Sequence, residues 1–312
     1  MQKKEAGPGL ALFVKGLFIG LGNLTSGIPL ATIIFSLSFY EDFITFLKKT
    51  SSFSNITLLL NKDKEKANKA NKPKLFFSFT AGLLIGALAL PKLFGALMLS
   101  KPVYFNALYF GFVSASLIMI SRNIKPWTKS NLLILISTSA VTFLLFRIEP
   151  FTIPNHIPLL VIMGLAASLS ALLPGLSGTF ILAFLGQYYY LMDIFHNRSI
   201  ALIALFIAGI LLGIYSFSRL ISAFVSKRPV KSRIIFMGMV IGSIYKIWPW
   251  HYPTNAVILE GGRPIPLQVR CFIPTNYQAD TIITAALLVF GFISAILFHL
   301  YLSNARPGHE EN

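Results

Sequence analysis

The residues best suited to chemistry in this chain form a short segment rich in glycine, serine and threonine. Its members are Pro174, Gly175, Leu176, Ser177, Gly178 and Thr179. Glycines let backbone N–H groups approach a ligand closely, and the apolar residues that follow predict a helix whose positive end faces the segment. Ser177 and Thr179 add hydroxyl groups. The segment predicts a site for a phosphate or carboxylate, and the alternative interpretation is a helix kink with close helix packing.

A weaker copy of this segment lies 148 residues earlier in the chain. Residues 21–44 align with residues 169–192. The first copy retains four residues that could contact the same ligand: Asn23, Ser26, Gly27 and Thr32. Downstream the alignment continues at an offset of 127, which aligns Lys92 with Arg219. A duplicated hydrophobic chain is typical of membrane transporters built from two related halves.

Three charged side chains inside long apolar segments are further candidates. Lys92 and Arg219 either bind a phosphate, one from each half, or extend along their helices to the membrane surface. Glu41 is the candidate for carrying a coupling ion, because a carboxylate within a membrane can relay protons or bind sodium. Alternatively, Glu41 closes a hairpin at the cytoplasmic surface. No metal-ligand spacing, nucleophile elbow or P-loop occurs, so we expect no metal, no cofactor and no enzyme activity.

Composition identifies the class of protein. Apolar residues make up 55% of the 312-residue chain and charged residues only 12%, and the mean hydropathy is +0.70. About a quarter of the residues are charged in soluble domains, so we predict an integral membrane protein. The formal net charge is +16, and the basic residues cluster between apolar runs. This pattern predicts loops that contact anionic membrane lipids, and not nucleic-acid binding.

Eight apolar segments follow one another along the chain. Six have the length of one membrane-spanning helix, about 20 residues: 75–99, 103–121, 130–146, 200–225, 233–249 and 281–303. The other two, about 10–47 and 157–195, are too long for one crossing and short for two, and each has a Gly/Ser/Pro cluster near its middle. We predict that each is a re-entrant hairpin of two short helices around a non-helical tip. Such backbone is tolerated at membrane depth where protein or water surrounds it.

The distribution of basic residues supports re-entrant hairpins. If both hairpins return to the side from which they enter, 18 Lys and Arg residues fall on one side of the membrane and six on the other. The positive-inside rule then assigns the richer side, with both termini and the Lys-rich loop 48–74, to the cytoplasm. The six on the opposite side are Lys101, Arg147, Arg198, Lys246, Arg263 and Arg270.

These patterns predict an all-α integral membrane protein made of two inverted-topology repeats, residues 1–150 and 151–312. Each repeat contains one re-entrant hairpin and three transmembrane helices, and the second also carries an outward loop at 251–280. Because each repeat crosses the membrane an odd number of times, the second is inverted relative to the first. We therefore expect the two hairpin tips to meet near the membrane midplane.

A set of residues spread over most of the chain, from about Lys15 to Trp250, points to a family. It comprises Asn23, Gly27, Thr32 and Tyr40-Glu41 in the first copy, Leu173 to Gly178, Leu185-Gly186 and Tyr188 in the second, and then Lys227-Arg228-Pro229 and Trp248-Pro249-Trp250. In these residues the chain resembles the bacterial polyprenyl-phosphate transporters, formerly a domain of unknown function. The first copy departs from the family's Pro-Gly-Val-Ser-Gly-Gly-Thr and has Ser-Gly-Ile-Pro-Leu-Ala-Thr at 26–32.

The resemblance implies translocation of undecaprenyl phosphate, the lipid carrier of cell-wall precursors. The lipid would move from the outer to the cytoplasmic leaflet of the bacterial inner membrane for reuse. Because inward movement of the phosphate opposes an inside-negative potential, we expect coupling to protons or sodium ions. Two alternatives stay open at this point: a secondary transporter of a small soluble anion, and a membrane lipid phosphatase.

Overall fold

The computed structural model describes residues 13, 16–17, 20, 29–50, 78, 80–86, 88, 101–151, 153–258, 264–275 and 278–304. The chain divides into two compact units. The first combines Met1–Leu24, Lys62–Asn123 and Pro274–Asn312, and the second combines Thr25–Asn61 and Ile124–Ile273. Each unit therefore contains segments from both sides of residue 150.

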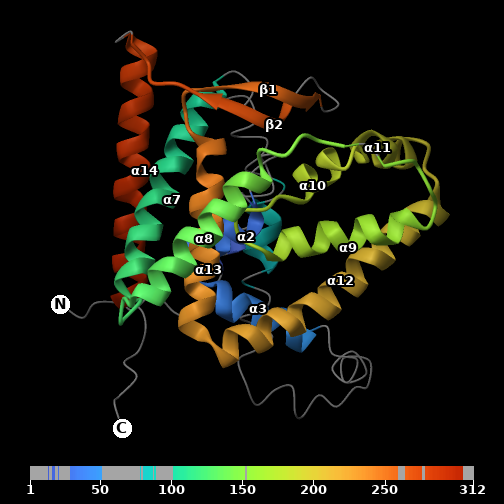
Figure 1. Cartoon of the computed structure of the whole chain (residues 1–312), viewed down its shortest axis with the longest axis horizontal. Coiled ribbons are helices and arrows are strands. Elements are labelled where there is room, and N and C mark those ends of the chain that lie inside the picture. The colour runs from blue at the N-terminus through green and yellow to red at the C-terminus, as the bar shows by residue number, and fades with distance from the viewer. Residues whose placement is uncertain are drawn as a thin grey trace. The chain divides into compact units, whose positions relative to one another are not determined.

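Two long helices, α7 (Pro102–Arg122) and α14 (Ala279–Asn304), pack side by side in the first unit (Figure 1). Glycine allows their close approach. A Cβ atom at Gly111 would overlap the carbonyl oxygen of Leu288, and a Cβ atom at Gly291 would overlap that of Leu108. Small residues at such crossings are characteristic of helices that associate in membranes, where close packing replaces the hydrophobic effect.

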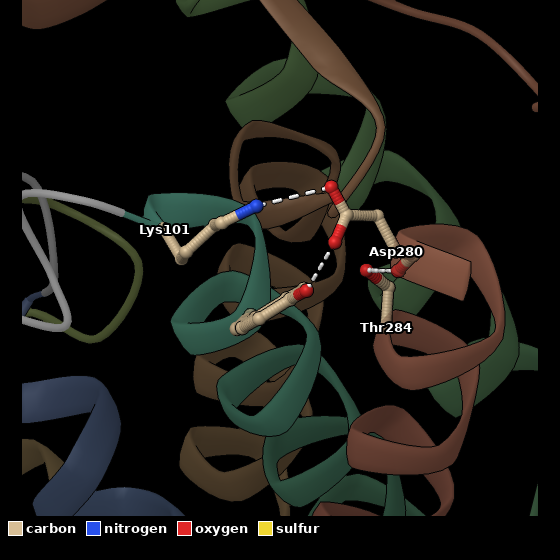
Figure 2. A network of polar contacts seen from close by, with 4 residues as sticks. Lys101, Asp280 and Thr284 are labelled. Carbon is tan, nitrogen blue, oxygen red and sulfur yellow. Dashed lines mark hydrogen bonds and ion pairs between the residues drawn. The ribbon is translucent and has the colours of Figure 1, made fainter. Parts of the chain in front are cut away.

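Polar contacts join α7 and α14 near one end of the pair (Figure 2). The Lys101 ammonium and the Tyr104 hydroxyl both donate to the Asp280 carboxylate, at 3.0 and 2.6 Å. The Thr284 hydroxyl donates to the Asp280 backbone carbonyl at 2.6 Å. The hydrogen bond to Asp280 raises the pKa of Lys101 above its ordinary value. Because both members of the ion pair are exposed, water screens it, and it acts mainly in aligning the two helices.

The second unit contains the other helices to which the structure assigns bounds. They are α2 (Leu30–Ser36), α3 (Tyr40–Thr50), α8 (Lys129–Leu145), α9 (Leu159–Leu172), α10 (Gly178–Phe184), α11 (Tyr188–His196), α12 (Ile200–Lys227), α13 (Pro229–Ser243) and the 3₁₀ turn η1 (Ile244–Ile247). Helix α9 lies along α12, and α8 lies along α13. Glycine again permits the contact, since a Cβ atom at Gly209 would overlap the carbonyl oxygen of Val161, and one at Gly164 that of Phe206.

Among the described residues, three helices are long and apolar enough to cross a membrane: Pro102–Arg122, Ile200–Lys227 and Ala279–Leu300. They coincide with three of the six predicted spans. The predicted spans 130–146 and 233–249 form the shorter helices α8 and α13, and α13 ends at Ser243 in the turn η1. Most of the predicted span 75–99 and the first part of the first predicted hairpin lie outside the described residues.

Both predicted hairpins contain a break that the sequence analysis missed. Helices α10 and α11 are separated by a turn in which Gly186 has a φ of 68°, and α2 and α3 by a turn in which Ser38 has a φ of 53°. The two turns have the same backbone hydrogen bonds, 148 residues apart. In the first turn, the amides of Leu37, Ser38 and Phe39 donate to the carbonyls of Ile33, Phe35 and Ile34, in that order. In the second turn, the amides of Leu185, Gly186 and Gln187 donate to the carbonyls of Ile181, Ala183 and Leu182, in that order. The duplication is thus present in local structure as well as in sequence.

A β-hairpin occupies most of the region predicted as an outward loop. Strand β1 (His251–Ile258) pairs antiparallel with β2 (Pro264–Cys271). In β2, Leu267 and Val269 are buried while the intervening side chains are more exposed, which is the two-residue period of a strand with one covered face. Leu267 packs into a buried cluster with Phe180 of α10. The expectation of an all-α chain is wrong at this hairpin, which packs against α10.

Replacing Gly209 by Val tests the close contact of α9 and α12. The added side chain would meet the Val161 backbone, which cannot move without displacing α9, and overpacking of this kind costs about 1–3 kcal/mol. We expect a lower midpoint of thermal unfolding for the detergent-solubilised protein. The control is Ala208→Val, on the exposed face of the same helix. Equal midpoints for the two variants would contradict the packing.

Candidate functional site

The segment 174–179 contains most of the connection between α9 and α10 and the first two residues of α10, and Gly175 is tightly constrained within it. Gly175 has a φ of +86°, in the left-handed region that favours glycine. A Cβ atom there would lie 2.7 Å from the Met239 carbonyl oxygen and 2.9 Å from the Ser243 Oγ, both on α13. The segment is therefore packed directly against α13, and this position requires glycine on two independent grounds.

A buried hydrogen bond joins this segment to the first copy of the motif. The Gly175 N–H donates to the Thr32 Oγ1 at 2.7 Å, and Thr32 on α2 is 3% exposed. The Tyr40 hydroxyl donates to the Leu172 carbonyl at 2.7 Å, which satisfies a carbonyl group left free at the end of α9. The structure thus brings together Thr32 and Gly175, two residues predicted from sequence to contact the same ligand.

Two hydroxyl groups lie at the start of α10. The Ser177 Oγ and Thr179 Oγ1 are 3.2 Å apart and share a hydrogen bond. A Cβ atom at Gly178 would lie 3.3 Å from the Ser170 Oγ, so the start of α10 runs close to α9. Helix α10 has only seven residues, and its dipole is correspondingly small. Anion binding here would therefore depend more on side chains than on the positive end of the α10 dipole.

Lys246 is a cation with a recorded contact to the residue that follows this segment. Its Nζ lies 3.5 Å from the centroid of the Phe180 ring and 4.3 Å from that of the Phe146 ring. Phe180 directly follows Thr179 in the first turn of α10. The sequence analysis counted Lys246 among the basic residues of outer loops and did not consider it for the site. Its position between apolar residues, just before Trp248-Pro249-Trp250, was the available signal.

The recorded contacts of two other charged candidates, Arg219 and Glu41, are with residues outside the segment 174–179. The Arg219 guanidinium lies 4.1 Å from the centroid of the Tyr215 ring on its own helix, and Arg219 is exposed. The Glu41 Oε1 accepts a hydrogen bond from the Arg233 Nε at 2.6 Å, and both side chains are partly exposed. Asn23, Ser26, Gly27 and Lys92 lie outside the described residues.

The long apolar helices, close glycine crossings and interrupted apolar segments define a helical protein of the membrane-spanning class. Comparison with known families makes this more specific. The chain belongs to the VCA0040-like family, described as undecaprenyl phosphate translocase-like, which matches residues 19–263.

One curated relative is similar to the chain over most of its length. It is a protein of Vibrio cholerae serotype O1 named polyprenyl-phosphate transporter, which is 26% identical over 275 residues. The match covers 87% of this chain and 88% of the relative. No solved structure is significantly similar to the chain.

Replacing Thr32 by Val tests the contact between the two motif copies. Val keeps the shape of Thr but leaves the buried Gly175 N–H without an acceptor, which costs about 1–3 kcal/mol. We expect a lower thermal unfolding midpoint, measured in detergent, and weaker protection of the Gly175 amide against hydrogen exchange. Thr32→Ser retains the hydroxyl and should stay close to the original protein. Unchanged exchange at Gly175 in Thr32→Val would contradict the hydrogen bond.

Proposed function

We propose that this protein moves undecaprenyl phosphate from the outer to the cytoplasmic leaflet of the bacterial inner membrane, so that the lipid carrier can be reused. Membership of the undecaprenyl phosphate translocase-like family carries the proposal, and the name of the Vibrio cholerae relative agrees with it. A lipid phosphate cannot cross the hydrocarbon unaided, because its charged head would lose its hydration. The protein must therefore offer a polar path while the polyprenyl chain stays in lipid.

The architecture proposed for this task consists of two inverted repeats, residues 1–150 and 151–312, each with a re-entrant hairpin. The turns that recur 148 residues apart in the two hairpins support the duplication. The hydrogen bond from Gly175 to Thr32 supports a meeting of the two copies. With both termini in the cytoplasm, the Lys-rich loop 48–74 faces the anionic lipids of the inner leaflet.

We assign the phosphate head to the polar residues around the segment 174–179. The described members of this set are Thr32, Gly175, Ser177, Gly178 and Thr179, and Asn23, Ser26 and Gly27 would complete it from the first copy. Hydroxyl groups suit phosphate oxygens, and none of these residues adds a negative charge that would repel the ligand. The Gly175 N–H already donates to Thr32, so Gly175 would contribute by allowing a close approach. Lys92 and Arg219 remain candidates for attracting the phosphate at the ends of the path.

Inward transport of a phosphate requires an energy source. A phosphate carries about −1.5 to −2 charges at neutral pH, and each charge moved against 100 mV costs about 2.3 kcal/mol. The opposing work is then about 3.5–4.6 kcal/mol per 100 mV. Entry of protons or sodium ions with the lipid would offset it. Glu41 is the proposed carrier, and its ion pair with Arg233 offers a mechanism, since neutralising Glu41 would release the arginine.

Surface labelling of undecaprenyl phosphate tests the transport function. In cells that lack the protein, we expect the lipid to accumulate in the outer leaflet, and the original gene should reverse the accumulation. Ser177→Ala, which removes one of the paired hydroxyls, should restore transport only in part, with normal amounts of protein in the membrane. Identical labelling with and without the protein would refute the transport function.

Glu41→Gln tests the ion coupling in liposomes that contain the purified protein. We expect an imposed proton or sodium gradient to increase the inward accumulation of undecaprenyl phosphate by the original protein and to have no effect on the variant. Asp42→Asn, at the exposed neighbouring carboxylate, is the control and should respond like the original protein. An undiminished response of Glu41→Gln would exclude this residue as the carrier.

A further inference from the structure

The turn η1 carries two hydrogen-bond donors that lack acceptors. In the part of the chain that the structure describes, no carboxylate forms a salt bridge with Lys246. The adjacent Tyr245 hydroxyl is buried and has no hydrogen-bond partner there. An ammonium group offers three donors and a phenol hydroxyl one. Lys246 is partly exposed, whereas a buried donor without an acceptor, such as the Tyr245 hydroxyl, is uncommon in proteins and needs a reason.

The aromatic contacts of Lys246 compensate its charge only in part. The Phe180 and Phe146 rings beside the ammonium are 3% and 2% exposed, so this environment is apolar. A cation over an aromatic ring gains a small fraction of what an ion loses when it leaves water. Elsewhere in the described chain, Lys101 and Arg233 each have a carboxylate partner. Lys246 has no such partner among the described residues, so a bound anion would stabilise its charged form.

The neighbourhood of Lys246 also responds to this charge. Burial lowers the pKa of the nearby His251, and the positive charge of Lys246 lowers it further, against the opposing effect of a hydrogen bond with the Trp248 carbonyl. His251 is therefore neutral at neutral pH, and the cations of this region are Lys246 and Arg147, whose charge acts on the Tyr245 hydroxyl.

Two sets of contacts connect Lys246 with the segment 174–179. First, its Nζ lies against Phe180, the residue after Thr179. Second, Ser243 lies three residues before Lys246, and the Ser243 Oγ would be 2.9 Å from a Cβ atom at Gly175. The end of α13 therefore packs against Gly175, and Lys246 of η1 packs against Phe180, the residue after Thr179.

We propose that Lys246, with the Tyr245 hydroxyl, binds the phosphate head of the transported polyprenyl lipid, between the Phe146 and Phe180 rings and the segment 174–179. The inference rests on the proposed function and names a residue for it. An ammonium and a hydroxyl supply donors to a phosphate monoester. Free inorganic phosphate offers the same oxygens and charge, so the test compares it with the lipid.

Binding to the full-length protein in lipid nanodiscs tests this assignment, with undecaprenyl phosphate, undecaprenol and inorganic phosphate as probes. Lys246→Gln should weaken undecaprenyl phosphate binding by about tenfold or more and leave undecaprenol binding unchanged. Lys246→Met keeps an apolar stem over the rings and should show the same loss. Arg270→Gln, which removes the same charge from an exposed position of β2, should bind like the original protein.

The outcomes separate the two proposals. If the original protein binds undecaprenyl phosphate and both folded Lys246 variants bind it equally well, the role of Lys246 is refuted and the transport function stands. If the original protein binds undecaprenol as tightly as undecaprenyl phosphate, phosphate recognition and the proposed function both fail. Inorganic phosphate that binds as tightly as the lipid would refute the lipid as the ligand of this site.

Discussion

The hydrogen bond between the Gly175 amide and the Thr32 hydroxyl joins the two copies of the motif. It exists because residues 173–177 are not helical, so the Gly175 amide has no partner within a helix. In an apolar surrounding, an unsatisfied amide is costly. The first copy of the motif supplies the missing acceptor from α2, and α13 closes on Gly175 from another direction. The position of α10, and with it the hydroxyls of Ser177 and Thr179, depends on this contact.

Much of the helical structure could be predicted because it follows from the length of apolar runs. The predicted spans 103–121 and 281–303 differ from α7 and α14 by one or two residues at each end. Apolar runs do not indicate where an α-helix gives way to a 3₁₀ turn. The span containing α13 was therefore predicted to continue to residue 249, whereas α13 ends at Ser243. The β-hairpin was missed because its two-residue alternation covers only a few positions and contains prolines.

The site was predictable only in its local parts. Gly175, Ser177 and Thr179 are close in sequence, and Thr32 was found because the motif is duplicated. Lys246 is different, because its relation to the site arises from contacts with Phe146 and Phe180 on distant segments. The distribution of basic residues among loops assigned Lys246 to the membrane surface. Its position over two buried rings appears only in the tertiary structure. A contact between a cation and side chains remote in sequence leaves no periodic signal in that sequence.

The glycine crossings between α9 and α12 restrict how the second unit can change shape. Gly164 of α9 lies against the Phe206 carbonyl of α12, and Gly209 of α12 lies against the Val161 carbonyl of α9. If one helix slid by one residue along the other, a side chain would overlap backbone atoms. Helices α9 and α12 are therefore expected to move together as a rigid body. Any conformational cycle then leaves the contact between these two helices intact, and changes of shape must occur elsewhere in the unit.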